Sequence, residues 1–119
     1  MIYLASPYSD PSLKVRTNRY LAACKAAAEM MEAGTVVFSP IAHTHGIALC
    51  GGLPMGWDYW ERVDREFLAA CNFMTVLMLD GWRESLGVAA EIRIAEESGK
   101  HITYAAPSAF QCFRGEKTQ

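Results

Sequence analysis

Among the charged residues of this 119-residue chain, Glu91 has the most apolar surroundings on a predicted helix. Asp80-Gly81, Ser85 and Gly99 predict a turn, a helix N-cap and a helix stop, so we expect a helix over about 86–98. Glu91 lies in its second turn, and its neighbours three and four residues away are Gly, Val, Ile and Ala. Because burying a lone carboxylate is costly, Glu91 is either a catalytic group or bonded to a neighbouring strand or subunit.

Three further side chains could act with such a carboxylate. Asp64 lies next to the apolar face of a predicted helix. Two carboxyl groups in one site can cleave an N-glycosidic bond, one as nucleophile at the anomeric carbon and one as proton donor to the leaving base. Tyr3 could fix the rotamer of the nucleophile, and Ser85 would stand at a helix N-terminus, which favours phosphate. The simpler alternatives are a solvated charge for Asp64, a core position for Tyr3 and a plain cap for Ser85.

Histidines and tryptophans supply the remaining candidates. His43 and His45 form an H-x-H pattern that binds metal in some hydrolases. No Asp or Glu lies close in sequence to complete a ligand set, so we expect contacts with a phosphate or a base, and neither a metal nor a cofactor. Trp57 and Trp82 are candidates for stacking a base, as is Trp60, although its place on an apolar helical face favours the core.

Composition narrows the class of protein. The 11 basic and 13 acidic residues give a net charge of -2, which is unlike the basic face of nucleic-acid polymer binders, so the expected partner is a small molecule. The chain has no pattern of a signal peptide and no uninterrupted membrane span, which indicates a cytoplasmic protein without a membrane partner. Four widely spaced cysteines form no C-x-x-C pair and are expected to be buried thiols in a reducing compartment: Cys24, Cys50, Cys71 and Cys112.

Strand and helix patterns alternate along the whole chain. Apolar runs predict strands, and amphipathic or alanine-rich stretches predict helices between them. From residue 41 to 57, four glycines and Pro54 predict an irregular excursion with at most one helical turn. One more helical turn is expected after residue 107. The expected strands are 1–5, 35–39, 73–79 and 101–105, and the expected helices are 15–31, 57–70 and 86–98.

This alternation predicts one α/β domain over residues 1–119. Parallel neighbours need right-handed crossovers, so we expect a small flavodoxin-like or Rossmann-like three-layer sandwich with a mainly parallel sheet of four or five strands. Ligands of such sheets bind beyond the carboxyl ends of the strands. The residues expected to bind substrate at or near that edge are Ser6, Tyr8, Ser39, His43, His45, Trp82, Ser85 and Gly87.

Three pieces of the sequence also resemble the nucleoside 2-deoxyribosyltransferase superfamily. They are Tyr3-Leu4-Ala5-Ser6-Pro7-Tyr8, Asp64 before the third strand, and Ser85-Leu86-Gly87-Val88-x-x-Glu91, which occur in the family's order and span most of the chain. Ser39-Pro40-Ile41-Ala42-His43-x-His45 is similar to an uncharacterised bacterial branch known as a domain of unknown function.

The resemblance implies roles for these residues. The last piece is most similar to the branch that hydrolyses deoxynucleoside 5'-monophosphates, which implies that Glu91 is the nucleophile and that Ser85 contacts the phosphate. By the same match Asp64 is the acid or base and Tyr3 the phenol beside the nucleophile. The sequence departs from that branch in a longer loop before Ser85, in its two histidines and in the absence of recognisable residues lent by a second subunit.

The expected function is therefore cleavage or transfer at the N-glycosidic bond of a nucleoside 5'-phosphate or related nucleotide. Two other classes stay open: a module of the same fold that binds or senses a nucleotide without turning it over, and an oligomeric scaffold that binds none. The apolar and aromatic surface of the predicted helix over 57–70 exceeds what one sheet face requires, which predicts a homodimer or homotetramer.

Overall fold

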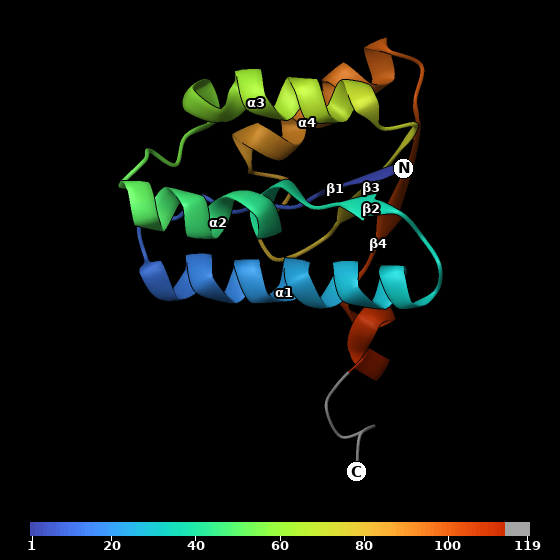
Figure 1. Cartoon of the computed structure of the whole chain (residues 1–119), viewed down its shortest axis with the longest axis horizontal. Helices are drawn as coiled ribbons and strands as arrows, with labels where there is room; N and C mark the ends of the chain where they lie inside the picture. Colours follow the sequence, from blue (N-terminus) through green and yellow to red (C-terminus); the bar gives the residue numbers. More distant parts are fainter. Residues whose placement is uncertain (114–119) are drawn as a thin grey trace.

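The protein is built on four parallel strands in the order β2-β1-β3-β4 (Figure 1). The computed structural model describes residues 1–113, with side chains up to residue 110. The strands are β1 (Ile2–Ala5), β2 (Val37–Phe38), β3 (Phe73–Leu77) and β4 (His101–Ala105), and every strand pair is parallel. The expected α/β class with a parallel sheet is confirmed.

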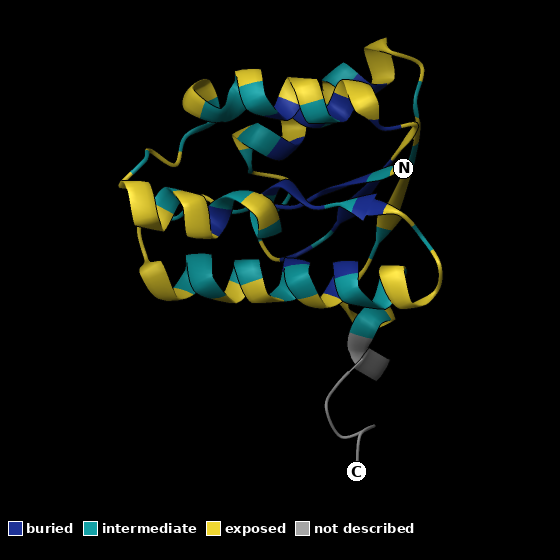
Figure 2. Ribbon diagram, viewed as in Figure 1, coloured by how far each residue is buried: buried dark blue, intermediate teal, exposed yellow. Residues whose placement is uncertain are grey.

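Helices cover both faces of this sheet (Figures 1 and 2). α1 (Leu13–Glu32) packs on one face, where Leu4 and Leu77 meet its alanines. α3 (Trp57–Ala70) and α4 (Leu86–Glu97) pack on the other face, where Tyr3 and Met74 join a second buried cluster. Since alternate strand residues point to opposite faces, the continuous apolar strands fill both layers.

The strand order places a crevice at one edge of the sheet. From β1 the chain passes by α1 to β2 on one side, and then crosses back over β1 to β3 on the other side. The loops that follow β1 and β3 therefore separate at the carboxyl edge, which is where open α/β sheets bind ligands. α2 and the N-terminus of α4 flank this edge.

The expected irregular excursion over 41–57 was wrong, because most of it forms α2 (Pro40–Gly51). Ser39 caps this helix by accepting the Ala42 N–H at 3.1 Å, and Pro40 occupies the first turn, where its missing N–H costs nothing. The helix ends at Gly52, whose φ of 64° is left-handed. The Ser39-Pro40 pair after the strand is therefore a helix start.

Smaller differences concern the strand ends and the cysteines. β2 has two residues where five were expected, and β3 ends at Leu77. The expectation of buried thiols was wrong for Cys50, which is exposed on α2, and Cys24 is half-buried, whereas Cys71 is buried. The side chain of Cys112 lies outside the described residues. The helical turn expected after residue 107 is the 3-10 helix η1 (Pro107–Phe113).

Within residues 1–113, no helix has both the length and the apolar character that crossing a membrane requires.

Candidate active site

Glu91 is buried where α4 packs on the sheet. The Ser85 Oγ accepts the Val88 N–H at 3.2 Å and starts the helix, so that the second turn carries Glu91 inward with only 4% of its surface exposed. The Tyr3 hydroxyl, from the middle of β1, donates a hydrogen bond of 2.6 Å to the Glu91 Oε2. Tyr3 itself is fully buried. This bond fixes the Glu91 rotamer, because both partners belong to packed secondary structure.

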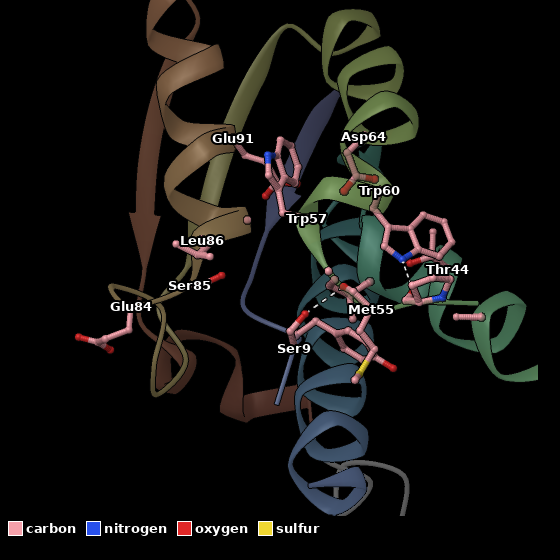
Figure 3. Close-up of a pocket in the computed structure, with 16 residues that line it drawn as sticks. Ser9, Thr44, Met55, Trp57, Trp60, Asp64, Glu84, Ser85, Leu86 and Glu91 are labelled. Atoms are coloured by element: carbon pink, nitrogen blue, oxygen red, sulfur yellow. Dashed lines mark hydrogen bonds between the residues drawn. The ribbon is translucent and has the colours of Figure 1, made fainter. Parts of the chain in front are cut away.

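Asp64 approaches from α3 and faces Glu91 across a cavity (Figure 3). It is 8% exposed, and Asp64 and Leu68 are the buried residues of this helix. Its Oδ1 has no hydrogen-bond partner among the described residues. Buried polar atoms of this kind are rare and mark positions where a ligand or water completes the bonding.

Burial changes the ionisation of this pair. Loss of hydration raises the pKa of Asp64 to about 6, an effect that its interaction with the Glu91 carboxyl group opposes. Loss of hydration also raises the pKa of Glu91 to about 8, which the Tyr3 hydrogen bond opposes and the nearby Asp64 charge reinforces. Burial, with the Glu91 charge, keeps the Tyr3 phenol protonated by raising its pKa. Two carboxyl groups this close share one proton near neutral pH and titrate as a pair.

The cavity between α3 and α4 has a volume of about 290 Å³. Its wall comes from four segments: the loop after β1, α2, the stretch from Pro54 into α3, and the start of α4. The described residues that line it are Tyr8, Ser9, Ile41, Thr44, Ala48, Pro54, Met55, Gly56, Trp57, Trp60, Asp64, Glu84, Ser85, Leu86, Gly87 and Glu91. This volume suits a single ligand of about nucleoside size.

Hydrogen bonds hold the loops at the mouth of the cavity. The Ser9 Oγ donates to the Met55 carbonyl at 3.0 Å, and the Trp60 Nε1 donates to the Pro54 carbonyl at 2.7 Å (Figure 3). The Trp57 indole reaches α4, since a Cβ on Gly87 would lie 3.7 Å from its ring. The stretch before α3 is therefore tied both to the β1 loop and to α3 itself.

Arg19 of α1 ties the β1 and β3 loops together. Its guanidinium donates to the carbonyls of Tyr8 and Ser9 at 3.4 and 3.0 Å and to that of Asp80 at 3.1 Å. Gly81 permits this approach, because its φ is +88° and a Cβ there would lie 2.6 Å from the guanidinium. The loops after β1 and β3 diverge at the carboxyl edge of the sheet, and Arg19 thus joins them next to α1.

Tyr8 is held by a histidine behind the cavity wall. The Tyr8 hydroxyl and the His45 Nδ1 are 2.6 Å apart, and the His45 ring stacks on Tyr20 with centroids 4.1 Å apart. Burial, with the charge of Arg16, lowers the pKa of His45, so the neutral ring is favoured. His45 therefore orients Tyr8 and does not itself line the cavity.

The structure brings some of the predicted site residues together and separates others. Tyr8, Asp64, Ser85, Gly87 and Glu91 line the cavity, and Tyr3 is one hydrogen bond away. The other five are elsewhere. Ser6 is buried, and its hydroxyl has no partner in the described part of the chain. Ser39 caps α2, His43 is exposed against Phe38 and Phe67, His45 lies behind Tyr8, and Trp82 packs near Tyr104. Of the other two tryptophans, Trp57 lines the cavity as expected of a stacking candidate, and Trp60 lines it as well.

The sequence analysis did not predict that α2 forms part of the cavity wall. Ile41, Thr44 and Ala48 recur at helical spacing and form one wall of the cavity. The Ser39-Pro40 helix start is the signal that could have revealed them.

A protein-family model matches the part of the chain that forms this site. No curated protein matches the chain. A family model described as "Domain of unknown function (DUF1937)" matches residues 1–106, a range that includes all four strands and every described residue of the cavity wall. The chain therefore belongs to the DUF1937 family.

Proposed function

We propose that this protein cleaves the N-glycosidic bond of a nucleoside or nucleoside 5'-phosphate, with Glu91 as nucleophile and Asp64 as acid and base. The observation that carries the proposal is the buried Glu91, bonded to Tyr3 at 2.6 Å and facing the buried Asp64 across a cavity of nucleoside size. A carboxylate pair kept out of water is costly for stability and is typical of general acid and nucleophilic catalysis. The resemblance to the nucleoside 2-deoxyribosyltransferase superfamily assigns the same roles to these residues.

The first chemical step uses the form of the pair in which the shared proton is on Asp64 and Glu91 is ionised, a form that the Tyr3 hydrogen bond to Glu91 favours. The Glu91 carboxylate forms a bond to the anomeric carbon while the bond to the base breaks, and Asp64 gives its proton to the departing nitrogen. Water then attacks the anomeric carbon and gives a proton to Asp64, which frees the Glu91 carboxylate. In a transferase a second base replaces the water.

Tyr3 and Ser85 support this chemistry from two sides. The Tyr3 hydroxyl stabilises the ionised form of Glu91 and aims it, as a donor to a carboxylate does. Ser85 and Gly87 line the cavity at the N-terminus of α4, where free N–H groups and the helix dipole favour the 5'-phosphate of a nucleotide. We also place the protein in the cytoplasm, because the exposed Cys50 thiol suits a reducing compartment.

A panel assay tests the proposal. The protein is incubated with ribo- and deoxyribonucleosides and their 5'-phosphates, with and without a second free base, and free base is measured by chromatography. At least one member should release base. Glu91→Ala should lower the rate by several orders of magnitude, whereas loss of a group that only orients substrate costs about 100-fold or less. Asp64→Asn should cost less for substrates with good leaving groups, which need less protonation.

The matched control is Glu97→Gln, an exposed carboxylate on the same helix, which should leave the rate unchanged. If the wild-type protein binds a panel member and releases base from none, the enzyme proposal fails and the nucleotide-sensing alternative replaces it. If Glu91→Ala retains the wild-type rate, Glu91 is not the nucleophile.

A further inference from the structure

The described side chains of Asp, Glu, Lys, Arg or His type that line the cavity are all carboxylic acids. Asp64 and Glu91 face each other across it, and Glu84 lies at its rim with the carboxylate turned outwards (Figure 3). Among its described lining residues there is no Lys, Arg or His. A ligand that enters this space meets negative potential, which is strengthened by the low local polarity.

The nearby cations serve the loops and do not line the cavity. Arg19 donates to three backbone carbonyls, and Arg16 donates to the carbonyls of Asp10 and Pro11 at 2.6 and 3.2 Å. Arg83 lies over the Trp82 ring at 5.0 Å, and Trp82 is outside the cavity wall. The described residues therefore provide no charged side chain that could neutralise an anion inside.

Asp64 requires a partner from the ligand. More than nine-tenths of this residue is buried, its Oδ1 has no partner in the described part of the chain, and the carboxyl points into the cavity (Figure 3). A desolvated carboxylate oxygen without a partner is unfavourable, and a positive charge opposite it removes most of that cost.

Aromatic rings complete the wall around this carboxyl group. Trp57, Trp60 and Tyr8 all line the cavity, and Trp60 is fixed by its hydrogen bond to Pro54. Tryptophan faces attract cations as well as flat rings, and a flat cation benefits from both effects.

We propose that the substrate of this site is an N-glycoside whose base carries a fixed positive charge, such as a pyridinium or N-alkylated purine nucleoside. This inference rests on the proposed function for the reaction, and adds the charge of the base.

A charged base changes the first step. The bond between the anomeric carbon and nitrogen breaks, its electron pair passes to the base and cancels the positive charge, and the Glu91 carboxylate bonds to the carbon. No proton is needed for departure, so Asp64 acts as a carboxylate that holds the cation. In the second step water bonds to the anomeric carbon, the ester bond breaks to restore the Glu91 carboxylate, and the proton of the water passes to Asp64.

The test measures binding without turnover. 1-Methylnicotinamide and nicotinamide differ by one methyl group and one charge, and neither carries a sugar that could be cleaved. The chain has three tryptophans, so their indole N–H signals in an NMR titration report Trp57 and Trp60 in the cavity and Trp82 outside it. 1-Methylnicotinamide should shift the two cavity signals and bind at least ~10-fold more tightly than nicotinamide. Asp64→Asn should reduce that preference to about threefold or less, whereas Glu97→Gln, with the same change in net charge, should keep it.

Equal affinities, absence of shifts with the cation, or an unchanged preference in Asp64→Asn would each overturn the inference. Its failure is distinguishable from that of the proposed function. Release of base from neutral nucleosides without a preference for the cation leaves the enzyme proposal standing and removes this one. A preference for the cation with no base released from any cationic or neutral nucleoside removes the enzyme proposal, and with it the substrate role of the cation, and leaves only a cation-binding site.

Discussion

Glu91→Gln should make the protein more stable at high pH while abolishing its chemistry. Glutamine has the shape of a protonated glutamic acid, so its side-chain carbonyl can accept the hydrogen bond from the Tyr3 hydroxyl. At pH 5, where wild-type Glu91 is protonated, the two proteins should have nearly equal free energies of unfolding. At pH 9 the wild-type protein contains a buried carboxylate that the variant lacks.

The pKa of Glu91 sets the size of this difference. Burial raises it from 4.5 to about 8. The folded protein therefore binds more protons than the unfolded chain between these values, and its stability falls as the pH rises through them. One pKa unit is worth about 1.4 kcal/mol and about three units fall between pH 5 and pH 8, so the variant should gain on the order of 4 kcal/mol relative to wild type between pH 5 and pH 9. That is a large fraction of the roughly 5–15 kcal/mol that stabilises a typical domain.

Urea unfolding at pH 5, 7 and 9 measures this gain, with Glu97→Gln as the control for an exposed carboxylate on α4. Other titrating groups cancel in the difference between variant and wild type, apart from Asp64, whose coupling to Glu91 acts in the same direction. A difference that stays constant from pH 5 to pH 9, or that matches the Glu97→Gln control, would refute the claim that Glu91 is a desolvated carboxylate held for function.

Two substitutions and one measurement of the oligomeric state test the remaining predictions. Tyr3→Phe removes the donor that lowers the pKa of Glu91, so the acidic limb of the pH–rate profile should move to higher pH, and an unmoved limb would contradict the assignment. Ser85→Ala should cost about 1 kcal/mol in urea unfolding through loss of the α4 cap, and should weaken binding of nucleotides but not of nucleosides if the cap contacts a phosphate. Light scattering at micromolar concentration should give a homodimer or homotetramer, since Tyr59 on α3 and Leu86 at the cavity rim are exposed, and a monomer would refute this.

The fold was predictable because each layer has its own local signal. Continuous apolar runs marked the strands, an apolar helical face marked α3, and Ser85 and Gly99 marked the ends of α4 to within a residue. α2 was missed because its pattern mixes three histidine and threonine side chains with glycines, so its stability comes from packing on α1 and β1 and from the Ser39 cap. Helices held by tertiary packing carry a weak signal in the sequence.

The site was predictable only in part, because its geometry depends on the order of the strands. Glu91 could be singled out from its helical neighbours, since its periodicity places it on the buried face of a single element. Asp64 could not be assigned in this way: its burial depends on α3 crossing back over β1, which places α3 beside α4. That crossing follows from the order β2-β1-β3-β4, which no local pattern specifies. The pairing of the two carboxyl groups is therefore a consequence of topology, and Glu91→Gln tests its energetic cost directly.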